Sequence, residues 1–80
     1  MAEPDIRVNY KGVACPYNYV KAKLVLEEMK MGRILEVVVD DGEPARHVPK
    51  SLERDGQTIL ESFKDENGLV HIVIQKTAEY

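Results

Sequence analysis

The sequence is short of cysteine, histidine and glycine-rich motifs, and each shortage excludes a class of function. It has one cysteine and two histidines among 80 residues, with no CxxC or HExxH pattern. A zinc site needs several such ligands at suitable spacing, so we expect no metal and no cofactor. The five glycines are scattered over separate turns, so no glycine-rich phosphate-binding loop is present.

Positive charge and long apolar runs are also lacking. The chain has 14 acidic against 11 basic residues, a net charge of −3. Nucleic-acid binding usually needs a basic surface, so we expect no direct nucleic-acid partner. No stretch approaches the roughly 18 apolar residues of a membrane span, and the first ten residues do not resemble a secretory signal. A lone cysteine fits a reducing cytoplasm, where we expect the protein to act, as a monomer.

The elements are predicted from apolar periodicity and from turn residues. Tryptophan is absent and Phe63 is the one phenylalanine, so the core must consist mostly of Val, Ile and Leu. We predict strands over about 5–10 and 34–40, and between them a helix over 16–31 that stops at Gly32. A second helix is expected over about 44–55, interrupted by Pro49 and closed by Gly56. The chain then forms a hairpin that starts at Ile59 and ends with a strand over 69–74.

The order βαβαββ predicts an α/β (α+β) two-layer sandwich, formed by a single domain of residues 1–80 with its core over about 5–76. Two helices cannot cover both faces of a four-stranded sheet, so we expect a mixed sheet with both helices on one face. A chain of this length buries roughly 60% of its unfolded surface and has little room for a deep pocket. The other sheet face is expected to be solvated. Alternation in the last strand supports this, because Val70, Ile72 and Ile74 share one face while His71, Val73 and Gln75 share the other.

The single cysteine, Cys15, stands where the first helix is predicted to begin. Proline is favoured at the first helical position, so Pro16 places Cys15 at or near the N-cap. The unpaired backbone N–H groups of residues 17 and 18, together with the helix dipole, would stabilise a thiolate or a persulfide anion there. Cysteines at such positions have pKa values lowered from about 8.5 to about 3.5–7.5. Free cysteine is also often a small buried hydrophobe, and the local pattern leaves both interpretations open.

The helix behind Cys15 has two apolar groups. The group that we expect to pack on the sheet comprises Tyr19, Ala22, Val25, Leu26 and Met29. The second group comprises Tyr17, Val20, Leu24 and Met31, and we expect Leu24 to pack against the neighbouring helix. Tyr17 and Val20 fit either that packing or an exposed docking surface for a partner, and the pattern leaves both open.

The remaining polar residues receive ordinary interpretations. Asp40 and Asp41 end a strand and are expected to serve the turn that follows. His47 is expected to cap or orient the second helix, and His71 to lie at the surface.

The stretches "NYKGVACPYN" and "GRILEVVVDDGEPARHVP" resemble the TusA/SirA-type sulfur carrier family, and the resemblance extends over about residues 5–76. Asn18 departs from this pattern because it replaces the second proline of the Cys-Pro-x-Pro motif, and Asn9 and His47 each stand where an aspartate is common. We expect Asn18 to keep the helix start, to add a polar group near the thiol and to bear on partner choice. The matching residues are Lys11, Gly12, Cys15 and Pro16 in the first motif and Asp40, Asp41, Val48 and Pro49 in the second.

The resemblance implies a carrier that holds a sulfane sulfur on Cys15 as a persulfide, rather than a multiple-turnover enzyme. A cysteine desulfurase or a rhodanese-like protein would donate the sulfur, and another relay protein would accept it. Gly12 would free the approach to the thiol and Pro16 would fix the helix start. Lys11 and Arg46 would add positive charge, although surface solvation is the simpler reading of both.

Two other functions stay open. One is a non-catalytic interaction or regulatory module in which Cys15 is inert. The other is a thiol redox protein, which we rank last because the chain has no second cysteine to resolve a mixed disulfide.

Overall fold

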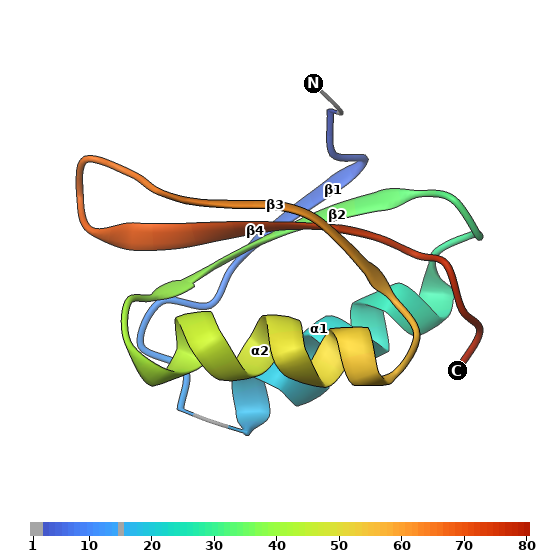
Figure 1. The fold of residues 1–80 in the computed structure, drawn as a ribbon, viewed down its shortest axis with the longest axis horizontal. Helices are drawn as coiled ribbons and strands as arrows, with labels where there is room; N and C mark the ends of the chain where they lie inside the picture. The colour runs from blue at the N-terminus through green and yellow to red at the C-terminus, as the bar shows by residue number, and fades with distance from the viewer. Residues whose placement is uncertain (1–2, 15) are drawn as a thin grey trace.

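The protein is a two-layer sandwich in which one sheet is covered on one face by two helices (Figure 1). The structure is a computed structural model that describes residues 3–14 and 16–80. The sheet order is β1-β2-β4-β3, with β1 parallel to β2 and β4 antiparallel to both of its neighbours. The predicted fold class is confirmed. In chain order the elements are β1 (Ile6–Asn9), α1 (Tyr17–Glu28), β2 (Ile34–Asp40), α2 (Glu43–Arg54), β3 (Thr58–Lys64) and β4 (Leu69–Gln75).

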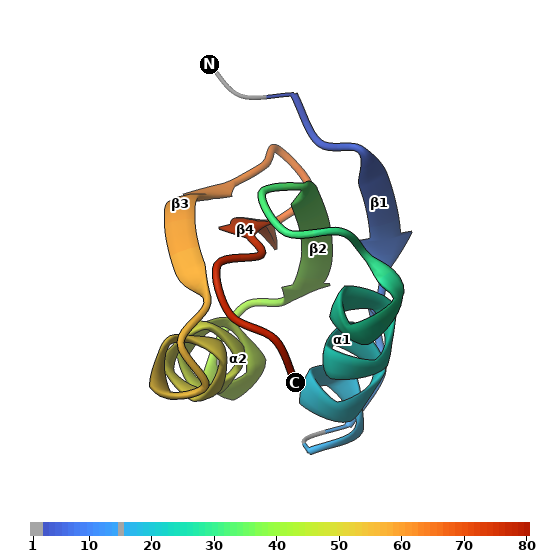
Figure 2. The same cartoon turned by 90° about the vertical axis from the view of Figure 1, so that its right-hand side faces the viewer.

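The core lies between the sheet and the two helices, with α1 on the β1 side and α2 on the β3 side (Figure 2). Branched aliphatic residues dominate it, as the scarcity of aromatic residues predicts. Residues 70, 72 and 74 of β4 face this layer and are buried, which confirms their predicted face. The buried cluster consists of Ala22, Leu26, Met29, Leu35, Val37, Val39, Val48, Leu52, Val70, Ile72 and Ile74.

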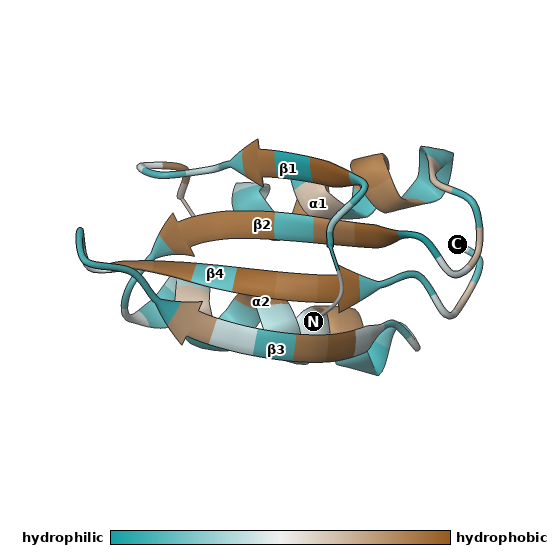
Figure 3. Ribbon diagram, turned by 90° about the horizontal axis from the view of Figure 1, so that it is seen from above, coloured by the Kyte–Doolittle hydropathy of each residue, from teal (hydrophilic) through white to brown (hydrophobic). Residues whose placement is uncertain are grey.

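The other sheet face is less solvated than predicted. Glu36 and Val38 of β2 and Val73 of β4 are each at most 8% exposed, although no helix covers them. The segment before β1 crosses in front of β2 (Figure 3). Its residues Glu3 and Pro4 border a cavity of about 260 Å³ that Glu36 and Val73 also line. The expectation of an open, solvated face was wrong at its centre, because a segment without regular structure shields it.

Helix α1 begins and ends at different residues from those predicted. Pro16 is its N-cap, with φ −96° and ψ 9°, rather than its first helical residue. The helix ends at Glu28, because the next residue, Met29, is already extended at φ −83° and ψ 152°. Gly32, with φ +86°, belongs instead to the turn into β2, where its N–H donates to the Lys76 carbonyl at 2.8 Å.

A buried lysine explains the early end of α1. The side chain of Lys76 is 1% exposed, and its ammonium donates to the Met29 carbonyl at 2.6 Å and to the Glu27 carbonyl at 3.4 Å. These carbonyls lie at the C-terminal end of the helix, where four C=O groups lack intrahelical partners and cations are favoured. Lys76 therefore caps α1 from the chain that follows β4.

Helix α2 is continuous through Pro49, so the predicted interruption was wrong. Proline in a helix removes one backbone hydrogen bond, and here it does not end the helix. Val48 and Leu52, on either side of it, are fully buried against the sheet. The burial of these two side chains offsets the lost bond. The helix ends at Arg54, close to the predicted stop at Gly56.

Candidate functional site

The predicted reactive residue, Cys15, lies outside the described residues, and the chain on either side of it frames the candidate site. The Ala14 carbonyl accepts the backbone N–H of Asn18 at 3.3 Å, and the Pro16 carbonyl accepts that of Val20 at 3.0 Å. The helix therefore begins at Tyr17, with Pro16 as its N-cap. Of the two N–H groups expected to serve the sulfur, that of Asn18 is already paired with a carbonyl.

The loop before position 15 is held by the second family motif. Gly12, with φ +78°, adopts a backbone conformation that favours glycine, and its N–H donates to Oδ2 of Asp40 at 2.7 Å. Lys11 donates its backbone N–H to Oδ1 of Asn9 at 2.9 Å, which shapes the same turn. The interpretation of Asp40 as simple turn chemistry was therefore too narrow. Its carboxylate joins the end of β2 to the loop that leads to Cys15.

The neighbouring acid, Asp41, does serve the turn, as predicted. Its Oδ1 accepts the N–H of Gly42, and its Oδ2 pairs with the Lys64 ammonium at 2.7 Å. The Lys64 hydrogen bond lowers the pKa of Asp41 most, followed by the Gly42 bond, while the charge of Arg46 adds a smaller effect. The positive charge of Arg46 thus acts on Asp41. The side chains of Lys11 and Arg46 are both exposed.

The side chain of Asn18, the main departure from the family pattern, is fully buried in the first turn of α1. Its Oδ1 accepts the N–H of Tyr19 at 2.7 Å. Its Nδ2 is the one buried side-chain polar atom without a hydrogen-bond partner among residues 3–14 and 16–80. Leaving a buried donor unsatisfied costs about 1–3 kcal/mol, so this group calls for an explanation.

Beyond this turn, α1 presents an exposed apolar stripe formed by Tyr17, Val20 and Leu24. Their exposed fractions are 64%, 41% and 55%. The prediction that Leu24 packs against the neighbouring helix was wrong. The two helices instead meet through Tyr19, whose hydroxyl donates to the Asp55 carboxylate at the end of α2.

A second polar cluster lies on the sheet face away from the helices, and the sequence alone did not reveal it. His71 bonds to Glu36 through Nδ1 at 2.9 Å and to Asp65 through Nε2 at 2.7 Å, and it stacks on Phe63 with ring centroids 4.8 Å apart. These bonds, with Glu36 first, raise the pKa of His71. The prediction of a surface histidine is confirmed only in part, since His71 lies on the outer face of the sheet but is half-buried, with 19% of its side chain exposed. The exposed His47 lies on α2, away from this cluster.

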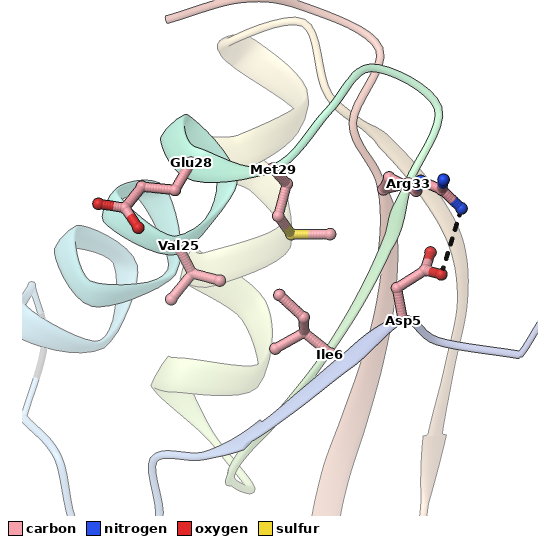
Figure 4. A pocket seen from close by; sticks show the side chains of 6 residues that line it. All are labelled: Asp5, Ile6, Val25, Glu28, Met29 and Arg33. Carbon is pink, nitrogen blue, oxygen red and sulfur yellow. Dashed lines mark ion pairs between the residues drawn. The ribbon is translucent and has the colours of Figure 1, made fainter.

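The larger cavity, of about 360 Å³, lies between the last turns of α1 and the start of β1, at the opposite end of α1 from Pro16 (Figure 4). Val25, Ile6 and Met29 point into it, and an ion pair of 3.6 Å between Arg33 and Asp5 closes one side. Neither helix of the described chain is long and apolar enough to cross a membrane. Within that same part of the chain, no three or more His, Cys, Asp or Glu side chains are grouped to hold a metal ion.

Comparison with known proteins identifies the family to which this chain belongs. The family model for sulfurtransferase TusA matches residues 6–76. A protein of Archaeoglobus fulgidus, named as a candidate sulfur carrier, is 42% identical over 53 residues, which are 66% of this chain and 60% of that protein. YedF of Escherichia coli K12, also named as a candidate sulfur carrier, is 33% identical over 73 residues, which are 91% of this chain and 94% of YedF.

A solved structure supports the same assignment. The crystal structure of a SirA-like protein from Desulfitobacterium hafniense aligns with a TM-score of 0.79 at 26% identity, covering 91% of this chain and 99% of that one. Its fold agrees with the mixed four-stranded sheet and two helices described above. The chain belongs to the TusA family of sulfurtransferases.

Proposed function

We propose that this protein is a sulfur carrier that holds a sulfane sulfur on Cys15 as a persulfide and passes it from a donor protein to an acceptor protein. Membership of the TusA family supports the carrier role. The observation that carries the proposal further is the bond from Gly12 to Asp40. It ties the loop leading to Cys15 to the end of β2, directly before a helix N-terminus that favours anions.

The transfer needs no oxidant or reductant. The Cys15 thiolate attacks the outer sulfur of a persulfide on the donor, the donor's S–S bond breaks, and the donor leaves as a thiolate. The new S–S bond places the transferred sulfur on Cys15. An acceptor thiolate then repeats the same exchange and restores the Cys15 thiolate. The free thiol that this cycle requires fits the cytoplasm, where we place the protein as a monomeric relay.

Mass spectrometry of the intact protein tests the carrier role. The protein is incubated with a cysteine desulfurase and free cysteine, and we expect a mass increase of one sulfur atom that a reductant removes. Cys15→Ser should show no increase. If neither the desulfurase nor a rhodanese-like donor loads the native protein, the carrier role is refuted. A Cys15 pKa at or above about 8.5, with slow alkylation, would then favour the interaction module with an inert cysteine.

The exposed stripe on α1 is the surface on which we propose that the sulfur donor docks. It begins at Tyr17, two positions after Cys15, and continues through Val20 and Leu24. Removing its apolar surface with Val20→Ser should slow sulfur transfer roughly fivefold, which corresponds to about 1 kcal/mol of lost binding. Leu60→Ser on β3 is the matched control, because Leu60 and Val20 are both 41% exposed. Equal rates for both variants would contradict docking on α1.

A further inference from the structure

Helix α2 carries a row of positive charges, which we call the basic row, formed by Arg46, Lys50 and Arg54. These residues are four positions apart, so they follow one another along the helix at intervals of about 6 Å. All three side chains are exposed, and none forms an ion pair with an acid of residues 3–14 and 16–80. Four other lysine and arginine side chains of the described chain do form such pairs. The basic row is therefore a patch of positive charge without ion-pair partners, on a chain whose net charge is −3.

The basic row points away from the sheet, and so does the apolar stripe of α1. Lys50 lies two positions from both Val48 and Leu52, which are fully buried in the core. Two positions turn an α-helix by about 200°, so Lys50 projects from the opposite side of α2. Leu24 of α1 likewise lies two positions from a fully buried residue on either side. Because both helices cover the same sheet face, the stripe and the basic row share the outer surface of the helix layer (Figure 2).

We propose that the sulfur donor covers both helices at once, with an apolar patch against the stripe of α1 and an acidic patch against the basic row of α2. This inference rests on the proposed function, because it extends the donor's docking surface to a second helix and states the charge of the partner. The stripe supplies apolar contact area. The basic row selects an acidic partner and speeds its approach, because complementary charges act mainly on specificity and on the rate of association.

A nucleic acid is the other class of partner that a row of cations could bind. Two exposed acids, Glu43 and Glu53, lie on the same helix and would repel a continuous phosphate backbone. The chain as a whole is negative, whereas nucleic-acid binding usually needs a basic surface. An acidic protein surface instead carries separate carboxylates beside apolar side chains. Such a surface matches a basic row that lies next to an apolar stripe, so we favour a protein.

Binding of the Cys15→Ser protein to a cysteine desulfurase and to a rhodanese-like donor tests the proposal, because this variant binds without transferring sulfur. The Kd is measured by calorimetry at about 50 mM and about 500 mM salt. Adding Lys50→Glu should weaken binding of the donor about tenfold at the lower salt and about twofold at the higher, because salt screens exposed charges. Lys30→Glu is the matched control, since Lys30 is exposed, follows the end of α1 and lies outside both surfaces. Its Kd should change by less than about twofold.

Equal weakening by Lys50→Glu and Lys30→Glu overturns the proposal, because a general loss of positive charge would then explain the result. Weakening that does not depend on salt also overturns it, and so does the absence of binding to both donors. A single-stranded RNA oligonucleotide is titrated in parallel. RNA binding that Lys50→Glu abolishes, together with unchanged donor binding, would assign the basic row to nucleic acid instead. Failure of sulfur loading with salt-dependent donor binding intact would refute the carrier function and leave the docking surface standing.

Discussion

The replacement of Lys76 by methionine isolates the energetic value of a buried charge at the end of a helix. Methionine has a similar length and keeps the apolar stem, but it cannot donate. The Met29 carbonyl, which accepts from Lys76 at 2.6 Å, and the Glu27 carbonyl, at 3.4 Å, would lose this donor. Lys76→Met therefore changes the hydrogen bonding at the C-terminus of α1 with little change in volume.

The magnitude follows from these two contacts. A hydrogen bond from a charged donor contributes about 1.5–3 kcal/mol, and the 2.6 Å bond should supply most of the total. The 3.4 Å contact is long and adds little. Removing the buried charge also removes its desolvation cost, which opposes the loss. Because the carbonyls are left unpaired, we expect a net loss of about 2 kcal/mol, or roughly 8–16 °C in Tm for a domain of this size.

Urea unfolding and thermal unfolding both measure this change. Glu79→Gln is the control, because Glu79 contacts the same ammonium at 3.7 Å but its side chain is 71% exposed. We expect the control to lose less than about 0.5 kcal/mol, as exposed ion pairs contribute little. A Lys76→Met variant as stable as the native protein would refute the reasoning, since the desolvation cost would then equal the value of the bonds. The Cys15 alkylation rate of the folded variant should not change, because the two ends of this helix are about 18 Å apart.

Two further predictions concern the polar contacts of the sheet. The bonds of His71 to Glu36 and Asp65 raise the pKa of its imidazole above the unfolded value of about 6.5. The stability that these bonds contribute is therefore complete below about pH 6.5, and it is lost as the pH rises through the raised pKa of the folded protein. Urea unfolding between about pH 6 and 9 should therefore show falling stability in the native protein and a flatter profile in His71→Gln, and parallel profiles would contradict this. Asp40→Ala removes the acceptor of the Gly12 N–H and should cost about 1 kcal/mol in thermal unfolding, whereas Asp40→Asn keeps an acceptor oxygen and should cost less. Equal losses in the two variants would show that this bond is not the cause.

The sequence predicted the parts of the fold that depend on local pattern. The β-branched run over 34–40 coincides with β2, and the alternation in β4 separated the face that packs on the helices from the other. The group of α1 residues predicted to pack on the sheet was also correct, because a period of 3.6 residues places it on one side. These patterns depend on residues close together in the chain, so no tertiary information was needed.

The errors arose where a distant residue decides the local outcome. The C-terminus of α1 depends on Lys76, which is more than forty positions further along the chain. The environment of His71 depends on the pairing of β2 with β4, which places Glu36 beside it. A helical wheel shows that α1 has two apolar groups, but it cannot show which one the neighbouring helix covers, and Leu24 was therefore assigned incorrectly. The family motifs located the candidate site, whereas the burial of Asn18 required the structure.

The bond between Gly12 and Asp40 also sets an order of events during synthesis. It joins residues 28 positions apart, and the strand that ends with Asp40 pairs with β4, the last strand of the chain. In a nascent chain that already contains Cys15, we expect the loop before it to be held only weakly until residues 69–75 have been made, because β2 still lacks its second partner strand. The thiol would thus acquire its surroundings only when the domain is nearly complete, which couples the readiness of the carrier to the success of its own folding.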